Sequence, residues 1–111
     1  MLIIFMSLVS NPCAKDIYRI LADDKKNNGD GVEFNQLKDK LIQKYEVREI
    51  AKLAGEMELV GVVSKGWVKD ADGRKHMKYT PGCQTEWSAL FANTLGYDPI
   101  ALGIPADLAN K

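Results

Sequence analysis

The sequence predicts a mainly α-helical domain that carries one small antiparallel β-hairpin. The chain has 111 residues, of which 46% are hydrophobic, and this suits one modest core. Apolar residues recur at helical spacing in four segments, whereas residues 59–80 show β-branched and alternating residues around an Asp-Gly turn. We therefore expect a single domain made of an apolar N-terminal segment (1–11), a head (12–82), and a C-terminal helix and tail (83–111).

The first two predicted helices flank a polar loop. Asn11-Pro12 is a good helix start, because Asn caps the helix and Pro fits its first turn, and we expect this helix to run to Ala22. The polar residues 23–31 include two glycines and predict a loop. A second helix is expected from Glu33 to Lys44, with apolar residues at i, i+3, i+7 and i+8.

The polar loop resembles a calcium-binding loop only in part. Aligning Gly31 with the glycine of such a loop puts Lys26 at the first ligand position and Leu37 at the last. A cation and an alkyl group cannot coordinate calcium, so we interpret the loop as solvated. The sequence predicts no metal site and no cofactor.

The middle of the chain predicts a third helix followed by the hairpin. The helix is expected from about Val47 to Met57, with charged residues on the face opposite its apolar stripe. The first strand is expected to begin at Leu59, and Asp70-Ala71-Asp72-Gly73 predicts the turn. The returning strand is expected over Lys75 to Thr80, where residues alternate.

The C-terminal part predicts a fourth helix and a short tail. The helix is expected from about Gln84 to Leu95, and Gly96 is a plausible stop. The tail contains two prolines, and we expect one further helical turn there. Its expected anchors are Ile100, Leu102, Ile104 and Leu108.

The apolar N-terminal run, MLIIFMSLV, does not predict a membrane segment. It is too short to span a bilayer, and no basic residue precedes Lys15, as a signal peptide would require. We expect this run to pack on the body of the protein or on a second subunit, in a cytoplasmic protein. Cys13 and Cys83 are interpreted as free thiols.

The chain offers little for catalysis. His76 is the only histidine, and no Ser or Cys partner stands at a recognisable spacing from it. Neither a GxxxxGK[ST] nor a GxGxxG motif occurs. We therefore expect a binding protein and not an enzyme.

The order helix, loop, helix, joint, helix, hairpin is that of a winged helix-turn-helix. Apolar residues along the third helix and directly after it fall on places that match the recognition helix of MarR-type transcriptional regulators and their archaeal and phage relatives: Val47, Ile50, Ala54, Leu59 and Val60. Asp72-Gly73-Arg74 and Tyr79-Thr80-Pro81-Gly82 resemble the wing tip and wing end of that family. Glu58 departs from the pattern, since the family usually has glycine there.

This resemblance implies sequence-specific binding of double-stranded DNA in transcription regulation. The recognition helix (about 47–57) would enter the major groove, and the wing (about 59–80) would lie along the adjacent backbone. Residues in these two elements could contact phosphate or base edges. The candidate DNA-binding residues are Arg48, Lys52, Lys65, Lys69, Arg74, Lys75, His76 and Lys78.

Local charge favours the hairpin as a contact surface. The whole chain is neutral, with 15 basic and 15 acidic residues, but residues 65–78 hold five basic residues against two acidic ones. The alternative is that these lysines only solvate and protect the hairpin edges. A second alternative is a winged helix that binds protein, because Glu46, Glu49 and Glu56 would repel a phosphate backbone.

The chain ends predict a homodimer. The fourth helix carries an apolar stripe that the head does not obviously need, and such a stripe, when exposed, usually marks an interface. Two half-sites would also give one small domain more specificity on DNA. The candidate dimerisation residues are Trp87, Leu90, Phe91 and Leu95.

Overall fold

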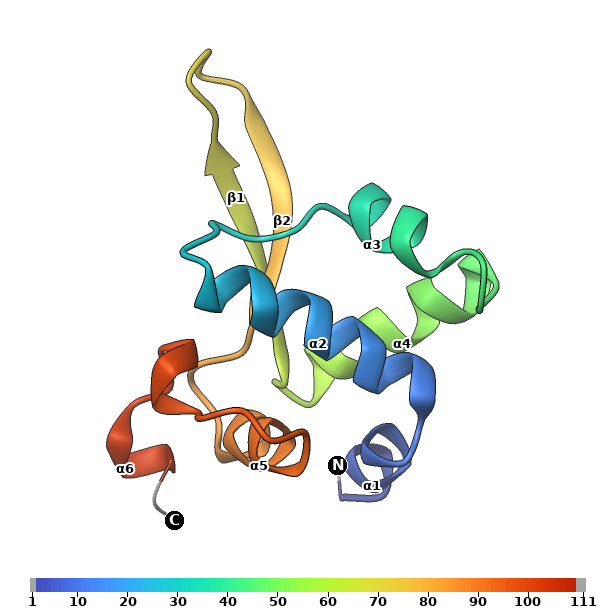
Figure 1. The fold of residues 1–111 in the computed structure, drawn as a ribbon, viewed down its shortest axis with the longest axis vertical. Helices are drawn as coiled ribbons and strands as arrows, with labels where there is room; N and C mark the ends of the chain where they lie inside the picture. Colours follow the sequence, from blue (N-terminus) through green and yellow to red (C-terminus); the bar gives the residue numbers. More distant parts are fainter. Residues whose placement is uncertain (1, 110–111) are drawn as a thin grey trace.

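The computed structural model describes residues 2–109 and confirms a mainly helical fold with one two-stranded hairpin (Figure 1). Four helices precede the hairpin, and three short helices follow it. In chain order the elements are α1 (Leu2–Val9), α2 (Pro12–Lys26), α3 (Phe34–Leu41), α4 (Val47–Leu59), β1 (Val63–Lys69), β2 (Lys75–Pro81), α5 (Glu86–Thr94), the 3-10 helix η1 (Ile100–Leu102) and α6 (Ala106–Ala109).

Helix α2 begins where the sequence predicts and ends later. The Asn11 side chain accepts hydrogen bonds from the backbone N–H groups of Cys13 (2.9 Å) and Ala14 (3.1 Å), which caps the helix. The expected end at Ala22 is wrong, because the helix continues to Lys26. Lys25 and Lys26 fall in its last turn, where positive charge is favourable at the end of a helix dipole.

Helices α3 and α4 also differ from the prediction at their ends. Helix α3 ends at Leu41, so the expected continuation to Lys44 is wrong; residues 42–44 form a turn. Helix α4 runs two residues beyond Met57 and ends at Leu59, which is 63% exposed. The hairpin therefore begins at Val63 and not at Leu59.

The hairpin is a regular antiparallel pair. Its register runs from Val63 opposite Pro81 to Lys69 opposite Lys75. A single bridge adds a short third partner, because Val32 and Tyr79 exchange backbone hydrogen bonds of 2.9 and 2.8 Å. This bridge holds the α2–α3 connection against the edge of β2 that does not pair with β1. No local sequence signal predicts the bridge.

The core lies among the helices, on the opposite side of the molecule from the hairpin tip. Tyr18 of α2 stacks against Phe91 of α5 with ring centroids 4.9 Å apart, and Phe5 of α1 packs on Trp87 at 4.7 Å. Leu8 of α1 is fully buried. The N-terminal run therefore packs on the body of this chain as a helix, one of the two arrangements expected for it.

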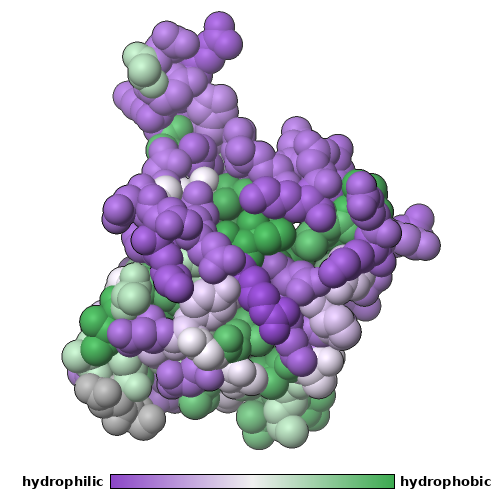
Figure 2. Space-filling view, viewed as in Figure 1, coloured by the Kyte–Doolittle hydropathy of each residue, from purple (hydrophilic) through white to green (hydrophobic). Residues whose placement is uncertain are grey.

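The hairpin projects from this helical body along the longest dimension of the molecule, 41 Å (Figure 1). In Figure 2 the projecting hairpin is mostly hydrophilic, whereas hydrophobic residues are visible between α2 and α3 and at the other end, over α1 and the C-terminal helices. Within residues 2–109, no helix has the length and hydrophobicity required to cross a membrane. Cys13 is buried, Cys83 is half-buried, and both are free thiols.

Candidate nucleic-acid interface

One face of α4 is open to solvent. The exposed residues at its centre follow helical spacing, and they are Arg48, Ala51, Lys52, Gly55 and Leu59; Val47 and Glu49 in its first turn are exposed as well. The opposite face packs into the core through Ile50, Leu53, Ala54 and Met57. A Cβ at residue 55 would meet no atom within 4 Å, so the centre of the open face is flat and accessible.

Three glutamates of α4 lie beside this open face: Glu49 is exposed, and Glu56 and Glu58 are half-buried. The charge of Glu49 acts on Cys13 at the start of α2; burial raises the pKa of that thiol to about 11, and Glu49 adds to the effect. Glu58 lies 3.7 Å from the ammonium of Lys65 on β1. Arg48 and Lys52 form no ion pair within residues 2–109.

The hairpin has two faces of different character, because successive side chains of a strand point to opposite sides. We call one the inner face; it consists of Ser64, Gly66, Val68, His76, Lys78 and Thr80. We call the other the outer face; it consists of Lys65, Trp67, Lys69, Lys75, Met77 and Tyr79. The inner face looks toward the α2–α3 connection, as its contacts show.

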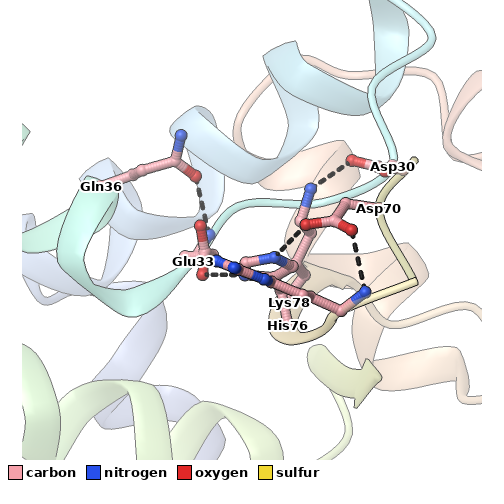
Figure 3. A network of polar contacts seen from close by, with 7 residues as sticks. Asp30, Glu33, Gln36, Asp70, His76 and Lys78 are labelled. Carbon is pink, nitrogen blue, oxygen red and sulfur yellow. Dashed lines mark hydrogen bonds and ion pairs between the residues drawn. The ribbon is translucent and has the colours of Figure 1, made fainter. Parts of the chain in front are cut away.

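On the inner face, His76 is held between two carboxylates (Figure 3). Nε2 lies 2.8 Å from Asp70 Oδ2 and Nδ1 lies 3.1 Å from Glu33 Oε1, so the ring donates to both carboxylates when it is protonated. The bond to Asp70 and then the bond to Glu33 raise the pKa of His76 above its usual 6.5. In return, the hydrogen bond from His76 lowers the pKa of Asp70.

Lys78 makes a parallel contact on the same face. Its ammonium donates to Asp30 Oδ1 at 2.8 Å, which raises the pKa of Lys78 and lowers that of Asp30 (Figure 3). Gln36 accepts a hydrogen bond of 2.9 Å from the backbone N–H of Glu33 and so fixes the residue that holds His76. The contacts of His76 and Lys78 attach the hairpin to the α2–α3 region, and they do not favour the predicted DNA contacts of these two residues.

The outer face and the turn hold the accessible positive charge. Lys69, Arg74 and Lys75 are exposed, and in the part of the chain that the structure describes they have no carboxylate within 4.0 Å. Lys65 is partly neutralised by Glu58. Asp70 is turned away from this surface, because its carboxylate accepts hydrogen bonds from His76 and from the backbone N–H groups of Asp72 and Arg74.

The predicted dimerisation residues are not all at the surface. Phe91 is 0% exposed and packs against Tyr18 and Phe5, so its expected place on an exposed stripe is wrong. Trp87 and Leu95 are half-buried against the same core, and Leu90 alone of the four is exposed. The physical reason is that α1 and α2 provide an apolar surface that α5 covers within the chain.

The surface of the described residues includes hollows between neighbouring helices. One, of about 360 Å³, lies between α2 and α3, and its lining includes Asp23, Asp24 and Lys40. Another, of about 210 Å³, lies between α5 and α6 beside Leu90. Within residues 2–109, no group of three or more His, Cys, Asp or Glu side chains is placed to hold a metal ion.

Comparison of the chain with protein-family models, curated proteins and solved structures finds no match.

Proposed function

We propose that this protein is a winged helix-turn-helix that binds double-stranded DNA and acts in transcription regulation. In this proposal the open face of α4 enters the major groove, and the hairpin contacts the adjacent phosphate backbone. The observation that carries it is the distribution of ion pairs. Arg48 and Lys52 on α4, and Lys69, Arg74 and Lys75 on the hairpin, are exposed without acidic partners in the described chain, whereas His76 and Lys78 are paired.

The element order and the shape of α4 support the same arrangement. Three helices, α2 to α4, lead directly into the hairpin, in the order of the family that the sequence resembles. Ala51 and Gly55 leave room on α4 for base edges to approach, with Arg48 and Lys52 beside them. Arginine binds guanine through two hydrogen bonds, so Arg48 is the best candidate for reading a base.

The experiment compares a specific duplex, selected from a random pool, with random duplex DNA. Arg48→Ala is expected to cost about 1–3 kcal/mol on the selected site and less on random DNA. Lys25→Ala is a matched control, because Lys25 is an exposed lysine at the far end of α2, beside Gly103 of the C-terminal tail. Equal binding of selected and random DNA by the unaltered protein would contradict the regulator proposal.

We also propose a homodimer, built on the N-terminal helix and on Leu90, the one exposed member of the apolar stripe that the sequence predicted. Four exposed apolar residues lie on the neighbouring helices α1 and α5, and they are Leu2, Ile3, Met6 and Leu90. This surface lies at the opposite end of the long axis from the hairpin (Figure 1). A two-fold axis perpendicular to the long axis would place the two hairpins at the two ends of the dimer, along one duplex.

Sedimentation at micromolar concentration tests the dimer. The unaltered chain is expected at about twice its mass, and Ile3→Asp is expected to shift it to monomer while the helical content stays the same, because Ile3 is 84% exposed. The same apolar surface favours the second candidate function, a winged helix that binds another protein. A monomer that binds no duplex DNA would favour that second function.

A further inference from the structure

We propose that Trp67 on the outer face of the hairpin is a stacking site for an unpaired nucleic-acid base. This inference deepens the proposed function, on which it rests, by naming the form of nucleic acid that the hairpin takes. It starts from the exposure of Trp67, which is 66% despite the size and apolar character of its ring. Tryptophan is usually largely buried, so an indole presented at mid-strand requires an explanation.

The surroundings of Trp67 are basic. Lys65 and Lys69 stand two residues to either side on the same strand and therefore on the same face, each about 7 Å away along β1. Lys75 lies opposite Lys69 on β2, and Met77 lies directly opposite Trp67. The outer face itself carries no acidic residue, and Asp70 of the turn is held on the inner side by His76; Glu58 of α4 lies 3.7 Å from the ammonium of Lys65, so Lys69 and Lys75 carry most of the available charge.

This combination fits a base with its flanking phosphates. An aromatic ring offers a flat surface to the π-face of any base, and lysines on both sides track the negative backbone. A base inside a duplex is already stacked on both faces, so only an unpaired base at a loop, a junction, a frayed end or a single strand can stack on Trp67. The contacts of His76 with Glu33 and of Lys78 with Asp30, together with the Val32–Tyr79 bridge, connect the hairpin to the body, so the ring has a defined place on the protein.

The outer face adjoins the end of α4, since Lys65 pairs with Glu58. A strand that leaves a duplex bound along α4 could therefore pass directly over Trp67. The shared chemistry is an unpaired base in a phosphodiester chain, which both DNA and RNA can supply.

The test uses the full chain and three probes: an oligo-dT of about ten nucleotides, an oligo-U of the same length and a blunt-ended DNA duplex. We expect both single strands to quench tryptophan emission, because stacking does not involve the sugar hydroxyl. Trp67→Ala should abolish the quenching and weaken single-strand binding by about 5- to 150-fold, while blunt-duplex binding changes less than about 2-fold. Trp67→Phe should retain most of the affinity, and Lys25→Ala should retain all of it.

The outcomes separate this inference from the proposed function. Duplex binding without single-strand binding, or equal losses on both in Trp67→Ala, would overturn the stacking site and leave the DNA-binding proposal intact. Single-strand binding that depends on Trp67, without duplex binding, would support the stacking site and overturn the duplex proposal. Binding of neither probe would overturn both. The oligo-dT and oligo-U arms show which nucleic acid is preferred.

Discussion

The two faces of the hairpin carry similar residues and use them differently. On the inner face, His76 and Lys78 are fixed by carboxylates of the α2–α3 connection and of the turn. On the outer face, Lys69 and Lys75 have no such partner among residues 2–109, and Trp67 is largely exposed. The comparison teaches that the net charge of a segment overstates the charge available to a ligand, because part of it is already neutralised within the fold.

The largest expected effect comes from removing the accessible charge. The triple variant Lys69→Ala, Arg74→Ala and Lys75→Ala should weaken duplex binding by about 10- to 100-fold, equally on all sequences, because phosphate contacts carry no sequence information. Fluorescence anisotropy on two unrelated duplexes measures this. A loss confined to one of the two sequences would show that these residues read bases.

Lys78→Ala is the matched variant on the inner face. Because Lys78 is already paired with Asp30, its removal should change duplex affinity much less than any single outer-face lysine. It should instead increase hydrogen exchange of the backbone near the Val32–Tyr79 bridge, since one attachment of the hairpin is lost. An affinity loss equal to that of Lys75→Ala would remove the distinction between the two faces.

The attachment of the inner face should depend on pH. The pKa of His76 is higher in the folded state than in the unfolded state. The stabilisation that its charged ring contributes is therefore fully present below about pH 6.5, and it is lost as the pH rises through the pKa of the folded state. The melting temperature should therefore fall between about pH 6 and pH 9 by more in the unaltered protein than in His76→Gln.

His76 is the only histidine, which simplifies this comparison. The measurements stay above about pH 5 so that the carboxylate of Asp70, whose pKa is lowered, remains ionised. The difference in melting-temperature change between the two proteins should be small, because the ion pairs of His76 are solvent-exposed. Identical pH dependence in both proteins would contradict the role of His76 in the attachment.

The smallest expected effect concerns α4. Gly55→Ala should raise the free energy of unfolding by roughly 0.5–1 kcal/mol, because alanine is the better helix former and the added methyl meets no atom within 4 Å. If the open face of α4 enters the groove, the same change should weaken duplex binding by a few-fold. Gly66→Ala, an equally open position on the inner face of the hairpin, should leave that affinity unchanged.

Local signals account for most of what the sequence could predict. The start of α2 follows from Asn11-Pro12, and the turn of the hairpin follows from Asp72-Gly73, where Gly73 adopts a φ of 81° that favours glycine. Helical periodicity placed α2 to α5, with errors only at their ends, but it did not predict α1, whose run of apolar residues shows no helical spacing.

Long-range contacts could not be predicted in the same way. The bridge of Val32 to Tyr79 joins two residues far apart in the chain and leaves no periodic pattern. Glu33 lies 43 positions from His76, so their pairing has no local signal either. Phe91 was misplaced because an apolar stripe looks the same in sequence whether it covers Tyr18 in its own chain or a second subunit.

The most direct test of the account is the salt dependence of duplex binding, measured between about 50 and 200 mM salt. The logarithm of the binding constant should fall steeply with the logarithm of the salt concentration, and the outer-face triple variant should lose about three units of that slope, one for each phosphate contact. Lys78→Ala should keep the slope of the unaltered protein. A slope near zero in the unaltered protein, or an equal loss of slope in Lys78→Ala and in a single outer-face variant, would contradict the account.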